Sequence, residues 1–162
     1  MRYKDGFKCD KQAKEKLKNL IENIWFSAYT ITYDMDNELD DKARIDVIFT
    51  ATSKSNKENH YKYAIELKER KKYNHNDFPD WMLEIDKYNI LKLLEMESGF
   101  TSCYCNFFLD NVYALWTINK IDEETEISSV YAPKQTQGDE TKIKKQYIKL
   151  IFDNATITGY TN

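Results

Sequence analysis

Large apolar side chains alternate with small or charged ones over residues 61–70, the clearest strand pattern in the chain. The large side chains occupy the odd positions: Tyr61, Tyr63, Ile65 and Leu67. A period of two is typical of a half-buried β-strand. Glu66 and Lys68 are two residues apart, so we expect both side chains on one face, roughly 7 Å apart along the strand.

A second strand is predicted over 42–52, with Asp46 on the face opposite to Ile45, Val47 and Phe49. Residues 53–59 are all polar and predict the connecting loop. A hairpin centred on this loop puts Asp46 opposite Glu66, with Cβ atoms about 5 Å apart. Facing carboxylates repel each other, and a divalent cation or a shared proton between them removes the repulsion.

The first part of the chain predicts an irregular arm, a helix and a strand. We expect the arm over 1–10, the helix over 11–26, a strand over 29–33 and an acidic turn over 34–41. The apolar stripe of this helix recurs at helical spacing: Leu17, Leu20, Ile21, Ile24 and Trp25.

The middle of the chain predicts a polar loop, a helix and a second hairpin. The loop is expected over 71–80, the helix over 79–97 and strands over 101–109 and 112–119. Pro79 is suitable at a helix start. We expect Gly99 to end the helix and Asp110-Asn111 to form the turn of the hairpin. Apolar residues predicted to be buried in this helix are Met82, Ile85, Ile90, Leu93 and Leu94.

The last part of the chain is polar, and we expect loops over 120–142 with a short strand near 128–131. A final strand is predicted over 147–152 and a tail over 153–162. No repeat or domain boundary is evident. We therefore expect a single domain over 1–162, with a core over about 11–119 and the C-terminal strand and tail over 120–162.

Composition excludes several function classes. The 162 residues are 41% hydrophobic and 14% aromatic, which is enough for a core. No G-x-x-x-x-G-K or G-x-G-x-x-G motif occurs, which argues against a glycine-rich nucleotide loop. With no apolar run of 18 residues and no signal peptide, we expect an intracellular, cytoplasmic protein without a membrane partner. The net charge is −3, yet the basic runs 11–18, 68–72 and 142–149 are either solvated faces or nucleic-acid contacts.

Cysteines and histidines add little candidate chemistry. Cys9, Cys103 and Cys105 are an odd number without a second pair, and we interpret them as small hydrophobic residues in a reduced compartment. His60 and His75 have no partner at metal-ligand spacing, and we expect both to be exposed loop residues.

Further aromatic residues have two interpretations. The loop from Tyr73 to Phe78 is either a nucleic-acid contact or an ordinary connector. Tyr113 and Trp116 are expected in the core or on a dimer surface rather than as stacking platforms for bases.

The order of helix, strand, hairpin, helix and hairpin, with an Asp on one hairpin strand and Glu-x-Lys on the next, resembles the PD-(D/E)XK nuclease superfamily. This superfamily has the restriction-endonuclease-like fold and includes Holliday-junction resolvases and many phage nucleases. The resemblance covers about residues 11–119. It implies an α/β fold in which helices flank a central mixed β-sheet.

Carried over by position, the resemblance makes Asp46 the motif Asp, Glu66 the (D/E) and Lys68 the Lys; Ile45 replaces the Pro of the family. Glu-x-Lys also occurs at 69–71 and 140–142, but only Glu66-x-Lys68 lies in an apolar alternation with an Asp opposite. The family often adds a Glu from the first helix. Glu15 fits this role by position, and Glu22 is the alternative; Lys87 matches a basic or polar residue on the second helix.

These residue types suit metal-dependent hydrolysis of a phosphodiester. Asp46, Glu66, the Leu67 carbonyl and Glu15 are the predicted ligands of Mg²⁺ or Mn²⁺. Lys68 is expected to orient or deprotonate the attacking water, or to stabilise the transition state.

The resemblance implies a DNA nuclease with DNA as its partner. A homodimer is plausible, and size and composition suggest a phage or mobile-element origin. The alternatives are a catalytically inactive module of the same fold that binds nucleic acid or protein, and a surface ladder of salt bridges with no catalytic role.

Overall fold

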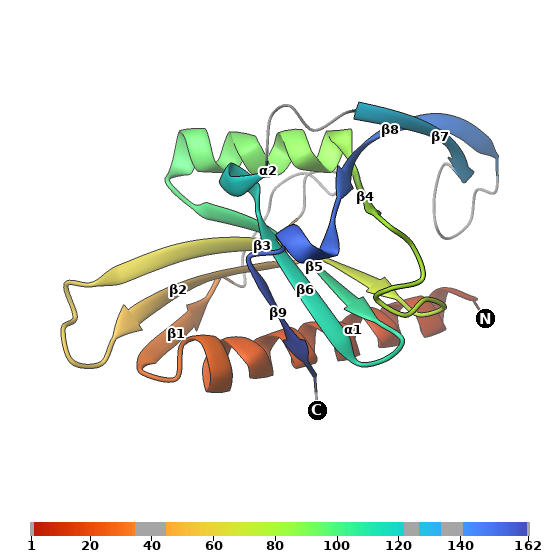
Figure 1. Cartoon of the computed structure of the whole chain (residues 1–162). Coiled ribbons are helices and arrows are strands. Elements are labelled where there is room, and N and C mark those ends of the chain that lie inside the picture. Colours follow the sequence, from red (N-terminus) through yellow and green to blue (C-terminus); the bar gives the residue numbers. More distant parts are fainter. Residues whose placement is uncertain (1, 35–44, 122–126, 134–140, 162) are drawn as a thin grey trace.

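The structure, a computed structural model, describes residues 2–34, 45–121, 127–133 and 141–161. Most of the acidic turn expected over 34–41 lies outside these residues. Helices cover both faces of a central sheet, with α1 on one side and α2 on the other (Figure 1). Among the described residues, no helix combines the length and apolarity that a bilayer crossing requires.

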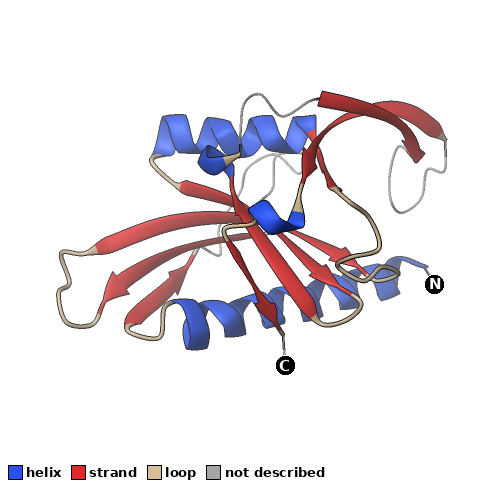
Figure 2. Cartoon of the chain, in the orientation of Figure 1, coloured by secondary structure: helices blue, strands red, loops and turns tan. Residues whose placement is uncertain are grey.

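The central sheet has six strands in the order β1-β2-β3-β5-β6-β9. Their bounds are β1 Tyr29–Tyr33, β2 Val47–Ser53, β3 His60–Arg70, β5 Thr101–Phe108, β6 Val112–Thr117 and β9 Ile157–Tyr160. Only β3 and β5 pair in parallel; the other neighbours are antiparallel. The sheet is therefore mixed, and the predicted α/β architecture is confirmed (Figure 2).

Helix α1 spans Arg2–Leu20 and continues into a π-helical turn, η1, over Ile21–Trp25. The irregular arm expected over 1–10 is wrong, because the helix already begins at Arg2. Leu17 and Ile21 are buried as predicted, but Ile24 is 63% exposed. A π-turn places more residues in each turn than an α-helix does, so the α-helical period no longer predicts the face of Ile24.

The helix expected over 79–97 is wrong in its first turns, because residues 81–84 form a strand. This strand, β4 (Trp81–Glu84), pairs with β8 (Lys142–Leu150), which also pairs with β7 (Ile127–Pro133). These strands form a separate three-stranded sheet. Met82 is thus a partly buried strand residue rather than a helical one.

Helix α2 spans Ile85–Ser98, and Gly99, with φ 69°, ends it as predicted. A positive φ favours glycine because it has no Cβ. Ile85, Ile90 and Leu94 pack on the core, but Leu93 is 51% exposed, contrary to expectation.

The described residues of the C-terminal part contain more secondary structure than the polar sequence predicts. β8 is longer than the strand expected over 147–152, and the expected tail contains the 3₁₀ turn η3 (Phe152–Asn154) and β9. A short strand was expected near 128–131, and β7 contains it. Another 3₁₀ turn, η2 (Ile118–Lys120), follows β6.

Two apolar clusters, one on each face, hold the sheet to its helices. One contains residues of α2, β4 and the even positions of β5, including Leu91, Trp81 and Tyr104. The other contains α1 residues and the odd positions of β5, including Leu17 and Cys105. Side chains alternate between the two faces of each strand, so successive residues of β5 belong to different apolar clusters.

Candidate active site

The hairpin of β2 and β3 has the register that the sequence predicts. Its paired residues run from Val47 opposite Ile65 to Thr52 opposite His60. One further step in this register places Asp46 opposite Glu66. Asp46 directly precedes β2, and its Oδ2 accepts a hydrogen bond of 2.8 Å from the Leu67 backbone N–H. This bond fixes the Asp46 carboxylate beside the middle of β3.

Glu66 is largely enclosed, with 12% of its side chain exposed. Its Oε1 lies 2.8 Å from Nζ of Lys87 on α2. Its Oε2 is buried and has no hydrogen-bond partner among the described residues. A buried oxygen of this kind is costly unless a proton or a cation occupies it.

The pKa of Glu66 is raised to about 7. Burial is the main cause, and the nearby Asp46 carboxylate adds to it; the Lys87 ammonium acts in the opposite direction. Two carboxylates that share a poorly solvated site resist being charged together. Glu66 therefore holds its proton more readily than an exposed carboxyl does, in spite of its ion pair with Lys87.

Lys68 lies on the same face of β3 as Glu66 and is partly buried. Burial lowers the pKa of Lys68, and Arg70 lowers it further, while Glu84 and Glu66 oppose this effect. Glu84 itself accepts a 3.0 Å hydrogen bond from Lys145 of β8. The ammonium of Lys68 therefore belongs to a mixed cluster of charges on the face of the sheet that α2 covers.

Arg70 continues this face and is fixed in position. Its guanidinium donates to the Met82 carbonyl at 2.9 Å and to the Tyr104 hydroxyl at 3.4 Å. It also lies 5.5 Å from the ring centroid of Trp81. Arg70 thus connects β3 to β4 and to the aromatic core.

The two acidic residues expected from the first helix lie in different surroundings. Glu15 is exposed, and Glu22 accepts a hydrogen bond from the Tyr33 hydroxyl at 3.0 Å. The α1 residue that reaches Asp46 is instead Lys14, with 4.0 Å between Nζ and Oδ1.

The donor set fits a hard divalent cation only in part. Asp46 and Glu66 offer carboxylate oxygens, and the Oε2 atom of Glu66 is free of protein donors in the described part of the chain. Within that part, no group of three or more His, Cys, Asp or Glu residues converges as a metal cluster. A cation here would take its remaining ligands from backbone carbonyls, water and substrate phosphate.

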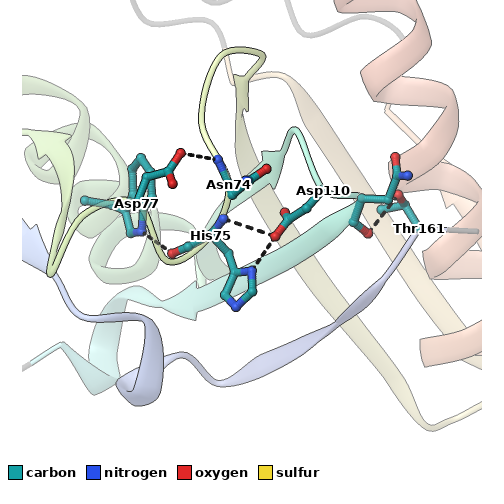
Figure 3. Close-up of polar contacts among 7 residues, drawn as sticks. Asn74, His75, Asp77, Asp110 and Thr161 are labelled. Carbon is teal, nitrogen blue, oxygen red and sulfur yellow. Dashed lines mark hydrogen bonds and ion pairs between the residues drawn. The ribbon is translucent and has the colours of Figure 1, made fainter.

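His75 has a partner that sequence reasoning missed (Figure 3). Its Nδ1 is hydrogen-bonded to Oδ2 of Asp110, 2.5 Å away, and its backbone N–H also approaches that oxygen. The two residues are 35 positions apart and come from different loops, so no local signal links them. His75 is therefore partly buried rather than an exposed loop residue, whereas His60 is exposed as expected.

Tyr113, Trp116 and the two cysteines of β5 are structural. Tyr113 and Trp116 are buried in the core, one of the two places expected for them. Cys103 and Cys105 are buried and free, and burial raises the pKa of both thiols. The side chain of Cys9 lies outside the described residues.

No family model matches this sequence, and no curated protein matches it. Among solved structures, the chain is similar to Hjc, a Holliday junction resolvase from the archaeal hyperthermophile Archaeoglobus fulgidus. The two chains are 12% identical with a TM-score of 0.48, and the match covers 91% of this chain and 94% of that chain. A similarity at this level does not indicate what reaction the chain catalyses, so its function must be inferred from the residues of the site.

Proposed function

We propose that this chain is a metal-dependent nuclease of the PD-(D/E)XK type that hydrolyses phosphodiester bonds in DNA. The observation that carries the proposal is the largely enclosed Glu66 beside Asp46. One of its carboxylate oxygens has no hydrogen-bond partner in the described part of the chain, and its pKa is raised to about 7. Perturbed carboxylates of this kind concentrate at functional sites. Three further parts of the proposal rest on the sequence alone. They are an intracellular location, a phage or mobile-element origin and a homodimer.

Asp46, Glu66 and the Leu67 carbonyl are the proposed ligands of Mg²⁺ or Mn²⁺, and Glu15 is a further candidate from the sequence. When bound, such an ion lowers the pKa of a coordinated water and neutralises charge on the phosphate. The negative charge of Asp46 and Glu66 would attract this ion.

The proposed role of Lys68 is to handle water and phosphate charge. Burial lowers the pKa of Lys68, which favours the neutral amine, and this amine would accept the proton that the attacking water loses. While it is protonated, Lys68 stabilises the negative charge that develops on the phosphate oxygens. The attacking oxygen forms a bond to phosphorus, the opposite P–O bond breaks, and the leaving alkoxide takes up a proton from solvent.

A specific observation favours a second candidate, a catalytically inactive module that binds DNA. Lys87 already engages one oxygen of Glu66, and the Leu67 N–H engages one oxygen of Asp46. Protein donors thus occupy part of the donor set that a cation requires. Such a protein binds DNA through its cations without cleaving it.

A plasmid-nicking assay with Mg²⁺ or Mn²⁺ separates these functions. We expect the wild type to nick, and Glu66→Ala and Lys68→Ala to lose about 10²–10⁴-fold in rate. Glu69→Ala is the matched control, because Glu69 lies on the same strand but alternates to the other face. Equal cleavage by all four proteins contradicts the site assignment. DNA binding by a wild type that does not cleave favours the inactive module.

A further inference from the structure

Two exposed aromatic rings lie side by side on the loop that follows β3. Tyr73 is 42% exposed and Phe78 is 47% exposed, and their ring centroids are 5.0 Å apart at a near-perpendicular angle of 73°. Both rings pack against Trp81, at 6.3 Å and 5.4 Å. Trp81 is itself buried and therefore gives the pair a fixed base.

The loop that carries these rings is held by several hydrogen bonds (Figure 3). The Asn74 N–H donates to the Asp77 carboxylate at 2.7 Å, and His75 is bound to Asp110 in the turn between β5 and β6. The Tyr73 carbonyl accepts a bond of 2.9 Å from the Leu109 N–H. Rings on a preorganised loop bind a partner with little further loss of entropy.

The aromatic pair lies at the end of the charged face that contains the candidate site. Arg70 is four residues after Glu66 on the same face of β3, about 13 Å along the strand. The Arg70 guanidinium lies over Trp81, which contacts both exposed rings. Arg70 and Trp81 therefore connect the strand of Glu66 to the exposed rings. Exposed aromatic rings close to cations are the combination that binds a single nucleic-acid strand.

We propose that Tyr73 and Phe78 form a stacking platform for unpaired bases of the DNA strand whose phosphate reaches Glu66. The substrate class is then branched or frayed DNA with a single-stranded arm next to the cleavage point, rather than a fully paired duplex. Lys72, exposed in the same loop, is placed to contact the backbone of this arm. The inference rests on the nuclease proposal for its biological purpose, but the platform binds bases whether or not cleavage occurs.

Binding without metal tests the platform separately from catalysis. A forked duplex with 2-aminopurine in one single-stranded arm is compared with a fully paired duplex of the same sequence, both in EDTA. We expect the wild type to prefer the fork and to change the 2-aminopurine fluorescence by stacking on the base. Tyr73→Ala with Phe78→Ala should weaken fork binding about tenfold or more and leave duplex binding within about twofold.

Three further variants keep the result interpretable. Tyr61→Ala removes an exposed tyrosine from the opposite end of β3 and should leave fork binding unchanged. Phe78→Leu preserves apolar packing on Trp81 but lacks a ring face, and should reduce fork binding even if the double variant unfolds. Phe78→Trp should retain fork binding, because the indole offers a larger stacking face.

Equal losses on fork and duplex, or no loss on either, overturn the platform; so does fork binding without a fluorescence change. A wild type that stacks the base in EDTA yet never cleaves in Mg²⁺ supports the platform and removes the nuclease proposal. Cleavage of duplex and fork at equal rates, with no effect of the double variant, retains the nuclease and removes the platform.

Discussion

Lys87 of α2 and Glu66 of β3 form an ion pair of 2.8 Å across the interface between helix and sheet. Lys87 lowers the pKa of Glu66, while burial and Asp46 raise it more strongly. Helix α2 therefore covers the sheet and also affects the site: its Lys87 increases the fraction of Glu66 that is charged near neutral pH.

Replacing Glu66 by Gln should stabilise the protein at alkaline pH. The folded-state pKa of about 7 lies above the ordinary 4.5, so the folded protein holds this proton where the unfolded chain has released it. Stability therefore falls as the pH rises from about 4.5 to 7, and Gln carries no such penalty. We expect Glu66→Gln to gain about 1–3 kcal/mol in free energy of unfolding at pH 8 and almost nothing at pH 4. Urea unfolding at both pH values measures this, with Glu69→Gln as control; a less stable variant at pH 8 contradicts it.

Replacing Lys87 by Gln should move the pH dependence of cleavage toward alkaline pH. Without the ammonium, the pKa of Glu66 rises further, and less of the carboxylate is charged at pH 7. We expect the rate at pH 7 to fall roughly 3–10-fold and to recover by about pH 9. Initial rates between pH 6 and 9 measure the shift. Lys92→Gln on the same helix is the control, and an unshifted profile for Lys87→Gln would exclude the coupling.

Divalent cations should stabilise the wild type through Asp46 and Glu66. At about ten times its dissociation constant, a ligand adds about 1.4 kcal/mol to the free energy of unfolding, or roughly 3–6 °C in Tm for a chain of this size. We expect Asp46→Asn and Glu66→Gln to lose this response to Mg²⁺ in thermal unfolding scans. Glu15→Gln decides the role of Glu15: an unchanged response removes it from the ligand set, and a lost response includes it.

Removing the Asp110 carboxylate should loosen the loop that carries Tyr73 and Phe78. Burial would raise the pKa of Asp110, but hydrogen bonds from His75 outweigh this effect and lower it. The stabilisation is therefore present above the ordinary carboxyl pKa and disappears as the pH falls through the lowered value. We expect Asp110→Asn to cost about 1–2 kcal/mol at pH 7 and to approach the wild type in strong acid, where the carboxyl is protonated. Chemical unfolding at the two pH values tests this, and an equal cost at both argues against the carboxylate.

The register of the hairpin beside the candidate site could be predicted, because two local signals agreed, although the strand expected over 42–52 spans Val47–Ser53. The alternation of β3 fixed its faces, and the polar loop around Asn56 fixed the centre of the hairpin. Together they determined which positions face each other. Local patterns are sufficient where both partners are close in sequence.

The wrongly predicted elements are those whose strand partners are distant in the sequence. Pro79 and its acidic neighbours have the chemistry of a helix start, but Trp81–Glu84 pairs with β8, more than sixty residues later in the chain. No local pattern reveals such a partner, and the tertiary pairing overrides helix propensity. β9 is only four residues long and follows a polar stretch, so its pairing with β6 gave no sequence signal either.

The site shows the same limit. Glu15 and Lys14 are adjacent, but neighbouring residues on a helix point about 100° apart, and the pairing of Lys14 with Asp46 had no sequence signal. The contact between His75 and Asp110 depends on two loops meeting, which requires the fold.

The position of β9 has a consequence for biosynthesis. Every residue of β6 is buried, and β9 supplies the hydrogen-bond partners on its outer edge. A nascent chain therefore cannot complete this sheet on the ribosome until residues 157–160 have left the exit tunnel. A stop codon a few positions before Ile157 should yield a polypeptide in which the outer edge of β6 is unpaired. Such an edge promotes aggregation, so we expect this polypeptide to be degraded or to accumulate in inclusion bodies.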